Sequence, residues 1–280
     1  MMMIRPVRPD EAGLFSQLSD SVGWNISPAE CKLLTRGGAM QSFFAEVDGE
    51  IAGSIGMVRY EPRLTVFINM VIVKPDFRRR GIATAMVQHV LETGKAYRTF
   101  KLHATPEGSK VYAKLGFAPR RTLSFFAADR PELQRFADPS LAIRPLTADD
   151  MERVIRRDQA TFGAERRTLL EFNFQEYAPL ALAAGNDRGV ILGRRWKKYR
   201  QLAMLEADDL TAAATLAAHA AALDASQTMS IIVYDHQTEF QNILRQAGFA
   251  KVRETVDMEL GREARAPGAG YYAVYGGDMG

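Results

Sequence analysis

The chain has 280 residues, of which 47% are apolar and 25% charged, and its 36 Lys and Arg residues against 33 Asp and Glu residues give a formal net charge of +3. This composition is typical of an ordinary globular protein of about two domains. A nucleic-acid-binding protein would be expected to carry a basic stripe with interleaved aromatic residues, whereas only the triple arginine at 78–80 forms a dense basic cluster. The sequence has no apolar run long enough to cross a membrane, no signal-peptide core near Met1, and a single cysteine, Cys31, which cannot form an internal disulfide. We therefore expect a cytoplasmic protein without a membrane or nucleic-acid partner.

Apolar periodicity and turn residues divide the first half of the chain into strands and helices. Asp48-Gly49 and Glu61-Pro62-Arg63 are the turn signals between its three middle strands. In chain order we expect a strand at 4–7, helices at 10–22 and 28–36, strands at 42–47, 51–60 and 64–73, a helix at 81–95, a strand at 99–105, a helix at 107–115 and a strand at 117–127. These elements predict a mixed sheet with flanking helices, an α/β (α+β) fold.

The segment from Val71 to Thr84 has the features of a phosphate-binding helix start. It passes from a β-branched strand through a basic turn, Arg78-Arg79-Arg80, into the helix that begins near Gly81. The first turn of a helix leaves backbone N–H groups unpaired and carries a partial positive charge, so it attracts anions. Gly81 has no Cβ to obstruct a phosphate that approaches the backbone.

The second half of the chain follows the same plan. Ile4-Arg5-Pro6 followed by Asp10-Glu11 recurs as Ile143-Arg144-Pro145 followed by Asp149-Asp150, which indicates a duplicated unit. Prolines between Arg130 and Pro139 mark a linker at 130–140, so we expect domains at 1–129 and 141–280. We expect strands at 141–146, 180–184, 189–195, 199–206, 228–234 and 250–260, and helices at 149–161, 166–177, 208–225 and 238–247.

The spacing Arg78-x-x-Gly81-x-Ala83 resembles the acyl-CoA signature of the GNAT superfamily of N-acetyltransferases, and Tyr112-x-x-Leu115-Gly116-Phe117 resembles its second signature. The resemblance covers essentially the whole chain. The chain is similar in plan to a bacterial subgroup, the YitH-type acetyltransferases, which have a degenerate C-terminal GNAT-like domain. This resemblance implies tandem GNAT-like domains, each a central mixed β-sheet flanked by helices. The first domain would be catalytic, and the second would contribute to the acceptor site.

The same resemblance implies how acetyl-CoA is held. The backbone of Val71 and Val73 would pair with the pantetheine arm, backbone amides from Arg79 to Thr84 would bind the pyrophosphate, and arginine side chains would add charge-assisted contacts. The expected cofactor-binding residues are Val71, Val73, Arg78, Arg79, Arg80, Gly81, Ile82, Ala83 and Thr84.

The second half lacks this signature. Glu206, Asp208 and Asp209 place negative charge where the pyrophosphate would lie, and Leu244 stands at the position that matches Tyr112. We therefore expect the second domain to bind no acyl-CoA.

Acetyl transfer requires a proton donor for the leaving thiolate and a group that deprotonates the amine. Tyr112 occupies the family's position for the general acid, although a structural tyrosine is the alternative. Many family members carry a Glu where this chain has Phe67, so the usual base is missing. His103 is our candidate substitute because an imidazole titrates near neutrality; the alternative is a structural histidine, and the subgroup usually has Asp there.

Trp24, Asn25 and Asn69 are candidates to line the acceptor pocket, with a core role for Trp24 as the alternative. His236 beside Asp235 is too small a group for a metal site, so we expect no metal. The prediction is an acetyl-CoA-dependent N-acetyltransferase in which the amine of a small molecule, or an exposed amino group, attacks directly in a ternary complex. The alternative is a non-catalytic acyl-CoA-binding sensor or interaction module.

Overall fold

The computed structural model describes residues 1–24, 26–61, 65–224, 226–262 and 268–279. The chain forms two compact units. The first unit contains residues 1–120, 256–264 and 278–280, and the second contains residues 121–255 and 265–277. Both units therefore draw on separate parts of the sequence.

The first unit is built on a mixed sheet. Its strands β1 to β4 are antiparallel neighbours, β5 lies parallel to β4, and the end of β12 lies antiparallel to β5. The strands are β1 (Met2–Pro6), β2 (Met40–Val47), β3 (Glu50–Tyr60), β4 (Thr65–Val73), β5 (Thr99–Ala104) and β12 (Ala250–Gly261), and the helices are α1 (Ala12–Ser21), α2 (Pro28–Thr35), α3 (Ile82–Thr93) and α4 (Pro106–Lys114). Short 3-10 turns lie at Pro9–Glu11 and Pro75–Phe77.

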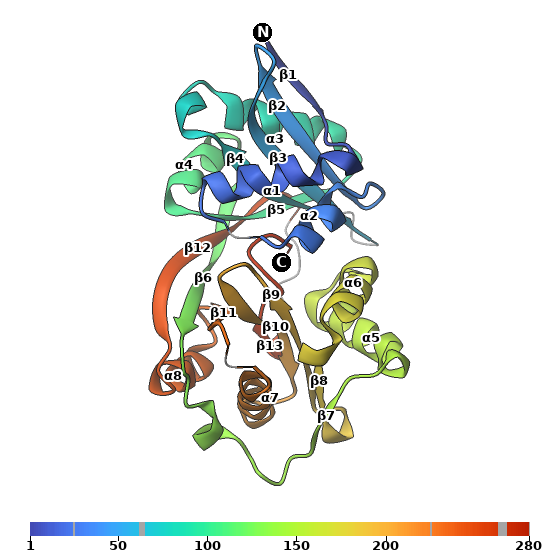
Figure 1. The fold of residues 1–280 in the computed structure, drawn as a ribbon, viewed down its shortest axis with the longest axis vertical. Coiled ribbons are helices and arrows are strands. Elements are labelled where there is room, and N and C mark those ends of the chain that lie inside the picture. The colour runs from blue at the N-terminus through green and yellow to red at the C-terminus, as the bar shows by residue number, and fades with distance from the viewer. Residues whose placement is uncertain (25, 62–64, 225, 263–267, 280) are drawn as a thin grey trace. The chain divides into compact units, whose positions relative to one another are not determined.

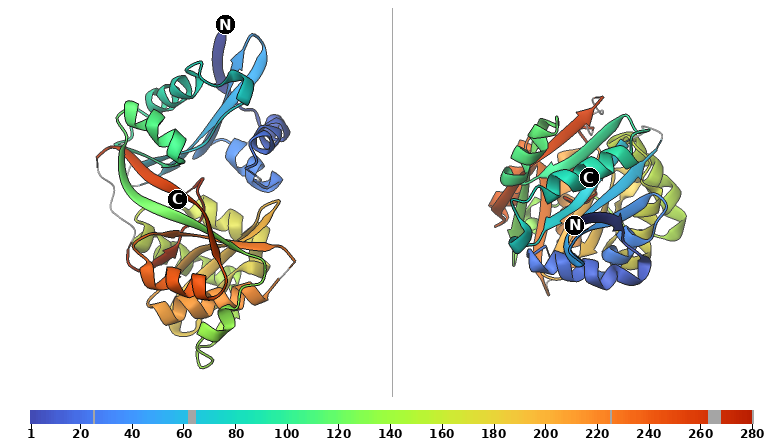
Figure 2. Two further views of the ribbon diagram at one scale, coloured as in Figure 1. Left: turned by 90° about the vertical axis from the view of Figure 1, so that its left-hand side faces the viewer. Right: turned by 90° about the horizontal axis from the view of Figure 1, so that it is seen from above.

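Helices cover both faces of this sheet, with α1 and α2 on one side and α3 and α4 on the other (Figure 2). On the α1–α2 face, the rings of Phe15 and Phe44 lie 6.3 Å apart and the Ser42 hydroxyl donates to the Leu34 carbonyl of α2. On the α3–α4 face, α3 buries Met86 and other apolar side chains against β3, β4 and β5. Burial of both faces explains the almost continuous apolar runs of β3 and β4.

The second unit repeats this plan. Its strands are most of β6 (Ala118–Ala128), β7 (Ile143–Pro145), β8 (Leu182–Ala184), β9 (Gly189–Arg195), β10 (Tyr199–Ala207), β11 (Thr228–Tyr234) and β13 (Tyr271–Ala273), and its helices are α5 (Met151–Phe162), α6 (Arg167–Tyr177), α7 (Leu210–Ala222) and α8 (Thr238–Gln246). Further 3-10 turns lie at Leu133–Phe136, Ala148–Asp150, Ala178–Leu180 and Gly185–Asp187. The alanine-rich α7 packs on β8, β9 and β10 (Figure 1), where its small buried side chains allow close approach.

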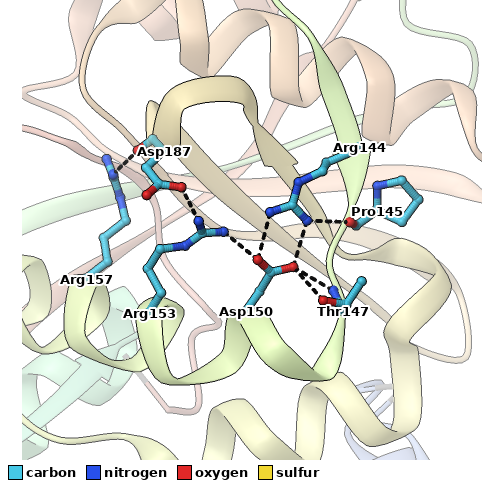
Figure 3. Close-up of polar contacts among 7 residues, drawn as sticks. All are labelled: Arg144, Pro145, Thr147, Asp150, Arg153, Arg157 and Asp187. Carbon is cyan, nitrogen blue, oxygen red and sulfur yellow. Dashed lines mark hydrogen bonds and ion pairs between the residues drawn. The ribbon is translucent and has the colours of Figure 1, made fainter.

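The predicted repeat is confirmed in atomic detail. Arg5 forms a bidentate ion pair with Glu11, at 2.8 and 2.9 Å, and Arg144 forms the same pair with Asp150, with both distances 2.7 Å. In Figure 3 the Asp150 carboxylate also accepts the Thr147 amide and faces Arg153. Each carboxylate thus fixes the entry of a strand into the following helix, because it satisfies backbone donors and an arginine together.

The closing strands differ from the prediction. The sequence assigned strand 117–127 to the first domain and strand 250–260 to the second, but residues 123–128 of β6 pair with β11, and residues 256–261 of β12 pair with β5. Each strand therefore completes the sheet of the other half, and the compact units differ from the predicted bounds 1–129 and 141–280. The alternating pattern of each strand specifies which face is buried but not which neighbour it joins.

One strand was not predicted. The three-residue β13 follows a glycine-rich segment and pairs with β10. Such a short strand leaves too few residues for an alternating pattern to be recognised. None of the described helices combines the length and apolar composition that a bilayer crossing needs.

The strand exchange predicts that the first half of the chain does not fold by itself. A fragment of residues 1–140 leaves the edge of β5 without β12 and residues 123–128 without β11, so we expect aggregation or non-cooperative unfolding. Circular dichroism during urea unfolding and size-exclusion chromatography would measure this. As a control, a fragment in which a Gly/Ser linker joins residues 250–262 to the end should unfold cooperatively, and a 1–140 fragment of equal stability would contradict the prediction.

Candidate functional site

The two central strands of the first unit part from each other. Parallel pairing of β4 with β5 runs from Thr65 opposite Thr99 to Phe67 opposite Lys101 and ends there. Immediately beyond this point the register of β4 against β3 shifts between Ser54 and Gly56, and Met70 adopts a positive φ of 49°. This bulge bends β4 and turns its edge away from β5.

The parting leaves one edge of β4 without a strand partner among the residues that the structure describes. The Lys74 amide donates to the Ala52 carbonyl of β3, and Ile72 also pairs with β3. Since backbone groups alternate in direction along a strand, the N–H and C=O groups of Val71 and Val73 point away from β3, toward the parting. There the Val73 carbonyl accepts a hydrogen bond of 3.2 Å from Arg78 Nε. The remaining groups of this edge can pair with an extended ligand.

The start of α3 adjoins this open edge. Gly81 is exposed with a φ of 77°, and Arg79 also has a positive φ, of 64°. The first helical bond of α3 runs from the Ala85 amide to the Gly81 carbonyl, so the amides of Ile82, Ala83 and Thr84 form the unpaired first turn. The side chains of Arg78, Arg79 and Arg80 are exposed around it. The open edge of β4 and the start of α3 with its exposed arginines thus form one surface that suits an anion, to which the buried Ile82 can contribute only its backbone.

Tyr112 lies on α4, on the α3–α4 face. Thr105 begins this helix, and its hydroxyl accepts the Gly108 amide at 3.2 Å. The Tyr112 ring packs edge-on against Phe117 with ring centres 6.0 Å apart, and burial raises the pKa of its phenol well above the usual value. The phenol therefore keeps its proton at neutral pH, as a proton donor must.

A group of polar side chains lies on the opposite, α1–α2 face. Phe67, Asn69, Lys101 and His103 share this face because Phe67 and Lys101 are paired and side chains alternate. Asn69 is only 4% exposed. Neither its amide atoms nor the two ring nitrogens of His103 have a hydrogen-bond partner among the described residues. Buried polar groups normally have partners, so these atoms indicate a site that a ligand or water completes.

The environment of His103 does not suit the role of general base that we expected for it. Its ring packs edge-on against Phe67 at 5.0 Å, and burial together with the positive charge of Lys101 lowers the pKa of its imidazole to about 3. The predicted base was chosen because imidazole titrates near neutrality, whereas this imidazole stays neutral and holds a proton weakly. Its surroundings suit a hydrogen-bonding group better than a proton acceptor for an amine.

The remaining acceptor candidates are less informative. Trp24 is half-buried between α1 and α2, where its amide donates to the Ser19 carbonyl and its own carbonyl accepts the Ser19 hydroxyl. Asn25 lies outside the described residues. Asp257 on β12, which lies directly opposite His103, was not among the predicted site residues. The alternation Asp257-Met258-Glu259 was visible in the sequence, but its pairing with β5 was not.

The second unit has the same parting, but the chain itself fills it. Parallel pairing of β10 with β11 ends at Gln201, and Met204 has a positive φ of 39° at a register shift, as Met70 has in β4. Here β13 pairs with β10 at Leu205 and Glu206. Beyond β13, the Met204 amide donates to the Val274 carbonyl, and the Val274 amide donates to Ile232 of β11.

The helix start of the second unit is also satisfied internally. The Asp209 carboxylate accepts the Ala212 amide at 2.8 Å, so a side chain of the protein occupies the anion position of α7. Asp208 forms an ion pair with Arg157 at 2.6 Å. Glu206 is fully buried, and its burial raises the pKa of its carboxyl group well above the usual value. Leu244 lies in the core of the second unit, as a position without catalytic function would.

No group of three or more His, Cys, Asp or Glu side chains that could hold a metal ion occurs in the described part of the chain.

Comparison with known proteins identifies relatives of both halves. Residues 13–117 match the Acetyltransferase (GNAT) family, and residues 154–273 match an Acetyltransferase (GNAT) domain. The uncharacterized N-acetyltransferase YitH of Bacillus subtilis is 26% identical over 180 residues, a match that covers 63% of this chain and 61% of that protein. The chain thus spans less than two thirds of the length of this relative.

Solved structures show the same fold over nearly the whole chain. A protein from Pyrococcus horikoshii assigned as an acetyltransferase superposes with a TM-score of 0.81 at 20% identity, covering 100% of this chain and 96% of its own. A tandem GNAT protein from the clavulanic acid biosynthesis pathway has a TM-score of 0.68 at 12% identity, covering 95% and 100% respectively. The predicted arrangement of two GNAT domains, each with a mixed sheet flanked by helices, is confirmed.

The low pKa of His103 predicts a loss of stability in acid. The imidazole of His103 is protonated below about pH 6.5 in the unfolded chain but only near pH 3 in the native protein. The free energy of unfolding therefore has its full value above about pH 6.5 and decreases as the pH falls below it. At pH 4.5 the loss should be on the order of 2–3 kcal/mol, at about 1.4 kcal/mol per pH unit. Urea unfolding at pH 7 and pH 4.5 would measure it. His103→Gln should remove this part of the loss and His219→Gln should retain it; equal losses in both variants would refute the assignment.

Proposed function

Because the chain belongs to the GNAT superfamily of acetyltransferases, we propose that its first unit transfers the acetyl group of acetyl-CoA to an amine. The observation that carries the proposal is the open edge of β4 at Val71 and Val73, which adjoins the unpaired first turn of α3. The edge suits an extended arm with amide groups, and the helix start suits a pyrophosphate. Acetyl-CoA contains both parts.

The residues proposed to hold acetyl-CoA act mainly through their backbone. Val71 and Val73 would pair with the amides of the pantetheine arm. The amides from Arg79 to Thr84 would bind the pyrophosphate, and the positive φ of Gly81 explains why glycine stands there. The exposed guanidinium groups of Arg78, Arg79 and Arg80 would add charge-assisted hydrogen bonds. The continuity of this surface from strand to helix supports the assignment.

The proposed reaction is direct attack by the acceptor. The amine nitrogen forms a bond to the thioester carbonyl carbon and the carbon–sulfur bond breaks. The nitrogen then loses one proton to water, and the departing thiolate gains one. Tyr112 is the proposed donor of that proton, since its phenol is neutral at physiological pH. The unpaired polar atoms of Asn69 and His103 support an acceptor site on the α1–α2 face. The acceptor would be a small-molecule amine or an exposed amino group.

We expect one acetyl-CoA molecule to bind per chain, because β13 and Asp209 already occupy the corresponding positions of the second unit. Isothermal titration calorimetry would give this stoichiometry. Gly81→Asp places a carboxylate at the start of α3, as Asp209 does in α7, and should weaken binding at least tenfold by charge repulsion. Gly49→Asp, at another exposed glycine with positive φ, is the control that should bind normally. A stoichiometry of two would refute the closure of the second unit.

Tyr112→Phe tests the proposed proton donor. Removal of the hydroxyl should lower kcat by about 10²-fold or more, whereas the Kd for acetyl-CoA should change little because the backbone holds the donor. Release of free thiol from acetyl-CoA in the presence of an acceptor amine measures turnover. Phe117→Leu alters the packing around the same ring and serves as a control for a purely structural effect. Unchanged turnover in Tyr112→Phe would exclude the role, and thiol release that never depends on an amine would favour a sensor.

A further inference from the structure

Two carboxylates of β12 lie on the α1–α2 face of the first unit. Asp257 is directly opposite His103 and Glu259 is directly opposite Lys101 in the antiparallel pair of β12 and β5. Both carboxylates are almost fully buried. Opposite residues of such a pair have Cβ atoms about 5 Å apart and share one face. The exchanged strand thus brings two acidic side chains to the face that carries Asn69.

The two carboxylates have different surroundings. Glu259 is held by two cations, Lys101 at 3.0 Å and Arg120 at 3.2 Å, and forms a structural ion-pair group. Asp257 also forms an ion pair with Lys101, at 3.5 Å, and it is the acidic residue level with His103. It is therefore the carboxylate nearer to the parting of β4 and β5, where the proposed reaction takes place.

Three kinds of acceptor atom lie on this face, at the next positions of the face beyond the last paired residues of β4 and β5, or opposite them. Asp257 has carboxylate oxygens, Asn69 has an amide oxygen, and a neutral imidazole such as that of His103 always has one unprotonated nitrogen. The polar atoms of Asn69 and His103 are buried and without partners within the described part of the chain. The close packing of Gly56 against Asn69, where a Cβ would lie 2.1 Å from the amide oxygen, fixes the Asn69 side chain. Leaving such groups unpaired is unfavourable, so a ligand that pairs with them gains binding free energy.

We infer that Asp257 binds the ammonium group of the acceptor, with Asn69 and His103 as its two further hydrogen-bond acceptors, and that the acceptor is a primary aliphatic amine. A primary ammonium group has three N–H donors and one positive charge, which matches three acceptors of which one is anionic. This inference rests on the proposed function, because it places the acceptor amine in the same site of the first unit. It makes the first unit dependent on a residue that lies near the end of the sequence.

The competing explanation is that Asp257 serves only as a second partner of Lys101. Both explanations predict some loss of stability when the carboxylate is removed. They differ for ligand binding, because only the inference requires Asp257 to contact the amine. Glu259 provides the matched control, since it is on the same strand and closer to Lys101.

The kinetic test uses the full chain, saturating acetyl-CoA and four probe amines: n-butylamine, 1,4-diaminobutane, phenethylamine and glycinamide. Asp257→Asn should raise the KM for the amine at least tenfold, as expected for loss of a charge-assisted hydrogen bond, and leave the KM for acetyl-CoA within twofold. Glu259→Gln should change the amine KM less than threefold, and Asp257→Glu should restore part of the affinity. An unchanged amine KM in Asp257→Asn, or an equal rise in Glu259→Gln, would overturn the inference.

A binding test separates the inference from the proposed function. In the presence of CoA, which carries no acetyl group, n-butylammonium chloride should raise the Tm of the wild-type chain but not that of Asp257→Asn, with tetramethylammonium chloride as the salt control. Equal shifts in both proteins, or no shift beyond that of the salt, would overturn the inference even where thiol release is observed. A selective shift without any thiol release would instead contradict the proposed acetyl transfer and leave the ammonium site supported.

Discussion

The site depends on one constraint: the backbone N–H and C=O groups along a buried strand edge need hydrogen-bond partners, whether from the chain or from a ligand. A bulge creates such an edge twice in this chain, at Met70 in β4 and at Met204 in β10, where both residues have a positive φ. In each unit the parallel neighbour separates after three paired residues. The second unit satisfies the edge with β13 and Val274, whereas no strand of the described residues pairs with the edge of β4 at Val71 and Val73.

The same difference recurs at the adjoining helix starts. The first turn of α7 receives the carboxylate of Asp209, while the first turn of α3 begins at Gly81, which has no side chain to offer. Both edges and both helix starts require an anionic or hydrogen-bonding partner, because backbone geometry is the same in the two repeats. What distinguishes a binding unit from a closed one is therefore whether the chain supplies that partner itself.

Sequence patterns predicted the local structure well because the information is local. The turn at Gly81, the glycines that end α4 and α8, and most element bounds follow from periodicity and from residues that tolerate a positive φ. The exchange of β6 and β12 depends on which of two similar edges a strand joins, and the pattern does not encode that choice. The low pKa of His103 depends on burial and on Lys101, which only the folded sheet brings together. Asp257 was missed for the same reason.

The repeat also shows which polar residues the fold itself requires. Thr65 and Thr99 begin the parallel pairing in the first unit, as Tyr199 and Thr228 do in the second, so Ala203 and Ile232 take the places of Asn69 and His103. Both replacements are apolar and buried, and the second unit forms the same bulge and sheet with them. The architecture therefore needs no polar side chain at either position. Since buried polar atoms without partners reduce stability, the unpaired atoms of Asn69 and His103 within the described part of the chain support the acceptor site that we propose for the first unit.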